Sequence, residues 1–162
     1  MSFDLAAKTD AELKTIIENH EKRQVWGTPL LLAARTELDR RQSAPLDLDT
    51  TLRLILDAAR EGKFISYKDV ADQSGQPWAK VYRKVVHHIG VLSRRELPRL
   101  GLMPSVMVVG RGEVHSGHLD EQKQAGFEKF FLELNPTESL RGAALVEREQ
   151  QKVFEHARTL LK

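Results

Sequence analysis

The sequence predicts a mainly α-helical fold (α+β class), with a winged helix-turn-helix core, a small β-hairpin and flanking helices. Helix-capping signals recur along the chain, and apolar residues follow them at three- and four-residue spacing. β-rich residues are confined to two short runs. The chain of 162 residues, 41% of them hydrophobic, can bury one good core. We expect an N-terminal helical hairpin (1–43), a winged helix-turn-helix domain (47–120) and C-terminal helices (121–162).

Two helices are expected in the N-terminal region. Thr9-Asp-Ala-Glu12 is a capping box and opens a helix near residues 10–21. Thr28-Pro29 opens a second helix, which ends in a charged region near residue 41. This αα-hairpin has too little apolar surface to stand alone, so it is either an addition to the core or a separate interaction module. Residues 42–46 have the composition of a linker.

A third helix and a helix-turn-helix follow the linker. Asp47 or Asp49 caps the third helix, Gly62 ends it, and a short strand covers residues 63–65. Ser66, with a carboxylate three residues later, starts a short helix at Tyr67 that ends at Gly75.

Pro77 opens a longer helix that runs to about residue 89. One face of this helix is apolar, and the opposite face carries Lys80, Arg83, Lys84 and His87. Two helices joined by a short glycine-containing turn, the second with a cationic outer face, are typical of a helix-turn-helix.

The C-terminal half adds the predicted wing. Residues 93–101 contain Pro98 and a glycine, which predict a surface loop. Two β-rich runs flank Gly110-Arg-Gly112, which predicts a hairpin with Arg111 at its tip. A helix over residues 121–134 follows, and Asn135-Pro-Thr-Glu138 is expected to cap the last one.

Charge and helix pattern together predict a non-enzymatic DNA-binding protein, a transcriptional regulator or DNA-associated protein that contacts double-stranded DNA. The net charge is only +2, but residues 63–113 hold nine basic and four acidic side chains. The second helix of the motif, which begins at Pro77, would enter the major groove, and neighbouring residues would contact the DNA backbone. The expected DNA-binding residues are Tyr67, Lys68, Lys80, Arg83, Lys84, His87 and Arg111.

A protein–protein interaction module on the same winged scaffold, without DNA binding, is the alternative. The low overall charge favours it, as do Asp69 and Asp72 beside the expected DNA-binding face. A homodimer or protein contact would then use the N- or C-terminal helices.

Residues 50–118 resemble the DNA-binding domain of the alkylguanine-DNA alkyltransferases and of the non-catalytic alkyltransferase-like proteins. The resemblance rests on Tyr67, Asp69, Val70, Ala71, Gly75 and Pro77 at the family spacing. It implies that Tyr67 sits beside a target phosphate. The base-flipping arginine of the family has no directly aligned counterpart: the ungapped position is Val81, and Lys80 and Arg83 are the nearest candidates. Pro104-Ser-Val-Met107 stands where the enzymes have Pro-Cys-His-Arg, so alkyl transfer is not expected.

Several other chemistries find little support. The chain has no cysteine, which excludes disulfides and thiolate sites. Ser105, His115 and Asp120 supply the residue types of a hydrolase triad, but no strained turn or oxyanion nest accompanies them. No cofactor or metal site is expected. The apolar runs are too short for a membrane span and no signal peptide is evident, so the expected location is cytoplasmic.

Overall fold

A computed structural model describes residues 4–42 and 46–160, so the centre of the predicted linker, residues 43–45, lies outside the described part. The prediction of a mainly helical fold is confirmed, with one small two-stranded sheet. The α-helices are α1 (Asp10–Lys22), α2 (Pro29–Gln42), α3 (Leu48–Arg60), α4 (Tyr67–Gln73), α5 (Trp78–Leu100), α6 (Glu121–Leu134) and α7 (Gly142–Thr159). The other elements are β1 (Ile65–Ser66), β2 (Val108–Val109) and two 3₁₀ turns, η1 (Pro104–Met107) and η2 (Arg111–Glu113).

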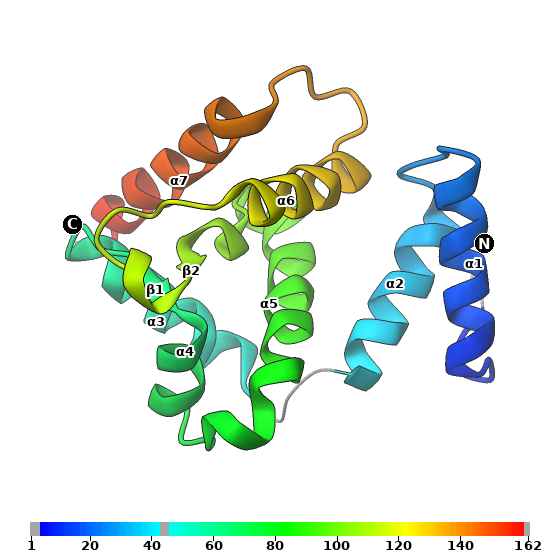
Figure 1. Cartoon of the computed structure of the whole chain (residues 1–162), viewed down its shortest axis with the longest axis horizontal. Helices are drawn as coiled ribbons and strands as arrows, with labels where there is room; N and C mark the ends of the chain where they lie inside the picture. The colour runs from blue at the N-terminus through cyan, green and yellow to red at the C-terminus, as the bar shows by residue number, and fades with distance from the viewer. Residues whose placement is uncertain (1–3, 43–45, 161–162) are drawn as a thin grey trace.

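Helices α1 and α2 form a pair at one end of the molecule (Figure 1). Their buried apolar residues, which include Leu13, Ile17 and Leu31, form a small cluster of their own. α2 also packs along α5, and Arg35 of α2 forms an ion pair with Glu133 of α6, so both helices join the pair to the remainder of the chain. A cluster of this size buries little apolar surface, so we expect the pair to need these contacts for its stability.

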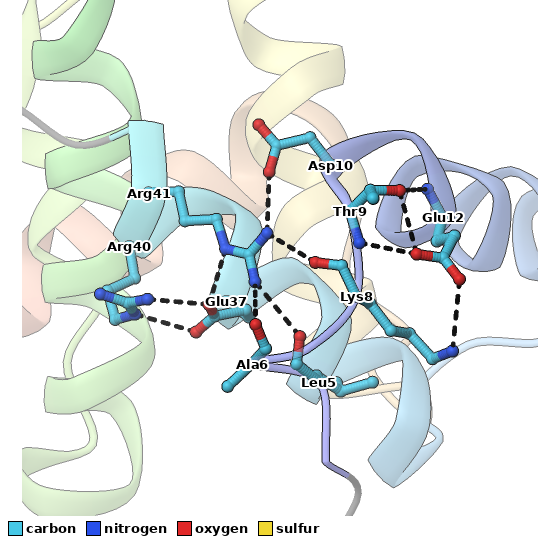
Figure 2. A network of polar contacts seen from close by, with 9 residues as sticks. All are labelled: Leu5, Ala6, Lys8, Thr9, Asp10, Glu12, Glu37, Arg40 and Arg41. Carbon is cyan, nitrogen blue, oxygen red and sulfur yellow. Dashed lines mark hydrogen bonds and ion pairs between the residues drawn. The ribbon is translucent and has the colours of Figure 1, made fainter.

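Arg41, near the end of α2, ties the segment before α1 to the helix pair. Its guanidinium donates hydrogen bonds to three backbone carbonyls and forms ion pairs with two carboxylates (Figure 2). Arginine can serve all of these acceptors because its planar group carries five N–H donors. The partners are the carbonyls of Leu5, Ala6 and Lys8 and the carboxylates of Asp10 and Glu37.

The main core lies between α3, α5, α6 and α7 and surrounds η1. Val106 and Met107 of η1 are completely buried, and helices α3, α5 and α7 all contact this turn. Leu92 of α5 and Leu145 of α7 are equally buried in the same cluster. Figure 1 shows α5 running through the middle of the molecule, between this core and the α1–α2 pair.

Most helix starts agree with the capping signals. Thr9 and Ser66 each make a complete capping box, with Glu12 and Asp69 respectively. Asp47 accepts a hydrogen bond from the amide of Thr50 and so caps α3. The last helix is an exception, because α7 begins at Gly142 and not at the predicted cap near residues 135–138.

The predicted hairpin around Gly110-Arg-Gly112 is wrong. The residues after β2 form the 3₁₀ turn η2, and β2 pairs in parallel with β1, with Ile65 opposite Val108. The β-rich run before the glycines therefore finds its partner beside α4 and not in the residues that follow it. Arg111 opens a turn and does not stand at the tip of a hairpin.

The predicted loop at residues 93–101 is also wrong, because α5 continues to Leu100 with Pro98 inside its last turn. A proline in the interior of a helix costs about 3 kcal/mol. Near the end of a helix it interferes less, because fewer backbone hydrogen bonds of the helix lie beyond it. Glu96 is completely buried and pairs with Arg95 and Arg99 on the same helix. Gly101 ends the helix in the left-handed conformation, at φ 69°, and its amide bonds to the carbonyl of Leu97.

None of the described helices has the length and apolar character that crossing a membrane requires.

We expect the folded protein to lose stability in acid because of His88 on α5. Its ring is 1% exposed, and Nε2 lies 2.8 Å from the hydroxyl of Thr51, which itself donates to the carbonyl of Asp47. Burial lowers the pKa of His88 to about 4; the charge of Asp47 opposes this and that of Arg95 adds to it.

Because the unfolded chain takes up this proton first, stability falls as pH drops from 6.5 towards 4, by about 2 kcal/mol near pH 5. Denaturant unfolding of the parent and of His88→Gln at several pH values measures this effect. The variant keeps an N–H for Thr51, and an equal acid sensitivity in both proteins would contradict the prediction.

Candidate nucleic-acid interface

The segment predicted to be a helix-turn-helix consists of α4, a turn that contains Gly75, and α5. Gly75 adopts φ +75°, which lets the chain reverse between the helices, and Pro77 directly precedes α5. Val70 and Ala71 of α4 are buried with Val81 and Val85 of α5 in the main core. In the first half of α5, the opposite face of the helix is turned towards solvent.

Three cations of this outer face are exposed and have no ion pair with any described residue: Lys80, Arg83 and Lys84. Their spacing of three and four residues places them along one side of the first half of α5. Arg111 of η2 is exposed and without an ion pair in the described ranges as well. Most other described lysines and arginines are paired, apart from Lys14, Lys22, Arg23 and Arg158.

Arg83 lies back along its own helix. Its Nε donates to the hydroxyl of Tyr82 at 2.9 Å, and the guanidinium carbon lies 5.4 Å from the centre of the tyrosine ring. Both side chains are exposed. Contacts of this kind at the surface are weak, so Arg83 can leave them for a stronger anionic partner.

A cleft of about 450 Å³ lies between α4, α5 and the residues around η2. Its inner wall carries Trp78, Tyr82 and Val86 of α5. Lys68 and Arg111 line it from the other elements. The cleft thus combines an aromatic wall with cations.

Tyr67 lines this cleft as well and is partly buried, which raises the pKa of its phenol. It therefore stays a neutral hydroxyl around pH 7. The structure thus brings three of the predicted residues, Tyr67, Lys68 and Arg111, to one cleft beside the cationic helix.

Two predicted contact residues already have partners. Lys68 forms an ion pair with Asp72 one turn further along α4. His87 Nδ1 lies 3.0 Å from the carboxylate of Asp39 on α2, and burial lowers the pKa of His87. Either side chain must leave its partner before it can bind a phosphate. The adjacent His88 faces the core instead and is 1% exposed.

Two exposed apolar side chains on α5, those of Tyr82 and Val86, were not among the predicted site residues. Tyr82 is 44% exposed and Val86 57%. Trp78 precedes them at the same four-residue spacing, and it packs partly against the main core, with its ring 6.0 Å from that of Tyr82. The sequence contains this pattern. Trp78, Tyr82 and Val86 recur at four-residue spacing, and they form a second row beside the row of exposed cations on α5.

Positions linked to the family resemblance are arranged differently from its motif. Val81, at the position of the base-flipping arginine, is 4% exposed and packs in the core, so it cannot enter a duplex. Ser105 is partly buried, and its hydroxyl has no hydrogen-bond partner among the described residues. Within the same ranges, no group of three or more histidine, aspartate or glutamate side chains is placed to hold a metal ion.

Comparisons of this chain with protein-family models, with curated proteins and with solved structures give no match.

Proposed function

We propose that this protein binds double-stranded DNA without catalysing a reaction, through the outer face of the first half of α5. The observation that carries the proposal is a group of exposed cations on the second helix of the proposed helix-turn-helix. These are Lys80, Arg83 and Lys84, which form no ion pair with a described residue. Elsewhere in the described chain most cations are neutralised by a neighbouring carboxylate. Free cations on one helical face are the electrostatic footprint of a phosphate-binding surface.

In the proposed complex, α5 lies in the major groove with its cationic stripe towards phosphates and base edges. Arg111 and the hydroxyl of Tyr67 reach the flanking backbone from across the aromatic cleft. Lys68 joins them by exchanging Asp72 for a phosphate, and His87 does so by leaving Asp39. Phosphate contacts fix the position of the protein on the duplex, whereas base contacts set any sequence preference.

A salt-dependent binding titration tests the proposal. Fluorescence anisotropy of labelled random duplex DNA is measured at several salt concentrations for the parent and for the triple variant Lys80→Ala/Arg83→Ala/Lys84→Ala. We expect binding at low salt that weakens steeply with added salt. If all three side chains contact phosphates, the triple variant loses roughly 3 from the slope of log K against log salt.

The chain provides a matched control on α1 and at the residue that follows it. Lys14, Lys22 and Arg23 are the same residue types, and they too have no ion pair with described residues. Alanine at these three positions changes the net charge equally and should leave most of the affinity. Equal losses in the two triple variants would contradict a specific role for α5, and no binding at low salt would contradict DNA binding altogether.

A protein partner is the second candidate, and exposure of Tyr82 and Val86 favours it. Large apolar side chains exposed side by side are common in protein interfaces. If the folded protein does not bind DNA at low salt, a protein-interaction function replaces DNA binding as our proposal.

A further inference from the structure

A second cleft lies far along α5 from Lys80, Arg83 and Lys84. It has a volume of about 650 Å³ and is formed by α2, the second half of α5, α6 and α7. Clefts of this size between helices are common small-molecule sites. We propose that this cleft binds a small organic acid with an apolar body, and the proposal does not depend on DNA binding.

The apolar part of the wall would hold the body of the ligand. Leu32 comes from α2, Leu97 and Pro98 from α5, and Phe131 and Leu134 from α6. An aromatic ring and four aliphatic side chains from three helices thus face one space. Burying an apolar ligand against them removes its surface from water, which is favourable.

The polar part of the wall has unused donors. One nitrogen of Arg94 bonds to Asp39, while its Nε is buried without a partner among the described residues. Nδ2 of Asn135 is buried without a partner in the same ranges. Lys152 uses one donor for Glu149, at 2.8 Å, out of the three that an ammonium carries.

Arg148 has spare donor capacity too, while the carboxylate of Glu138 in the same wall is occupied. Its Nε and Nη2 bond to Glu149 and Glu138, and Nη1 has no such bond with a described residue. Both oxygens of Glu138 are engaged, by Arg148 at 2.6 Å and by the amide of Leu140 at 2.8 Å. The wall therefore offers donors and positive charge, which suit a carboxylate or sulfonate.

Two fluorescent probes test the site in the full chain. Anilinonaphthalene sulfonate carries two apolar ring systems and an acid, and phenylnaphthylamine has the same rings without the acid. We expect saturable binding of the sulfonate, roughly tenfold tighter than that of the neutral probe, because charge-assisted hydrogen bonds add to the apolar contact. Equal affinity for the two probes would contradict recognition of an acid.

A large side chain introduced at Thr36 on α2 should occupy the cleft. It is exposed, lines the cleft and bonds through its hydroxyl to the carbonyl of Leu32. Thr36→Trp should abolish saturable binding. Thr15 on α1 is the matched control, since it is exposed and makes the same bond to the carbonyl of Ala11. Thr15→Trp should bind the sulfonate like the parent, and unchanged binding by Thr36→Trp would overturn the proposal.

Lys152→Gln tests the charge separately. The lysine is 43% exposed, and Glu149 keeps Arg148 as its other partner. We expect this variant to bind the sulfonate roughly fivefold more weakly and the neutral probe as before. Lys63→Gln, which removes a similarly exposed and paired lysine outside the cleft, should change neither affinity. Equal effects of the two substitutions would contradict a cationic contact in the cleft.

Discussion

Gly117→Ala should destabilise the protein by about 3 kcal/mol or more, as the combined result of backbone strain and overpacking. Gly117 adopts φ +67°, a conformation that disfavours any side chain. A Cβ atom there would lie 2.1 Å from Cζ of Phe64. That ring cannot withdraw easily, because it is buried and packs edge-on against Phe154 with a centroid distance of 5.2 Å.

A substitution at Gly62 measures the contribution of backbone strain without that of overpacking. Its φ is +70°, almost the same as that of Gly117, yet an added Cβ would meet nothing within 4 Å. Gly62→Ala should therefore cost only the backbone term, about 1 kcal/mol. Urea unfolding of the two variants and the parent measures the difference, and equal losses would show that Phe64 does not restrict position 117.

Arg35→Met should destabilise the protein by about 3 kcal/mol, because it leaves the carboxylate of Glu133 buried and without its charge partner. Nη2 of Arg35 on α2 lies 2.6 Å from the carboxylate of Glu133 on α6, whose side chain is 4% exposed. Burial already raises the pKa of Glu133, and the charge of Arg35 is the main effect that opposes it.

The loss in Arg35→Met should depend on pH and on residue 133. A carboxyl whose folded pKa is raised destabilises the fold as pH rises above its ordinary value of 4.5, so the deficit should shrink in acid. The double variant Arg35→Met/Glu133→Met should recover much of the stability, since two apolar residues can replace a buried ion pair. Denaturant unfolding at acidic and neutral pH tests both statements. A double variant no more stable than Arg35→Met would contradict this account.

Local chemistry made much of the fold predictable. Thr9, Asp47 and Ser66 cap helices because a side-chain oxygen reaches an amide three residues later, an interaction contained in the sequence spacing. The hairpin and the loop could not be predicted correctly for the opposite reason. β2 pairs with a strand far away in sequence, and packing of the buried residues Leu92 and Glu96 carries α5 past the position where a proline should stop it.

The candidate site was predictable to a similar extent. Helical spacing placed Lys80, Arg83 and Lys84 on one outer face, where the structure has them exposed. The partner of His87 could not be read from the sequence, since Asp39 lies on another helix in the N-terminal pair. Tertiary contacts, and not propensities, decide which cations stay available.

The parallel pairing of β1 with β2 has a kinetic consequence. Ile65 and Val108 can meet only after the chain between them, which contains α4 and α5, has folded back on itself. Closing so long a loop costs conformational entropy before the two short strands can return any stabilisation. The contact between α4 and α5 joins neighbours in the chain and can form early. We therefore expect the small sheet to assemble late and its closure to limit the folding rate of the central region.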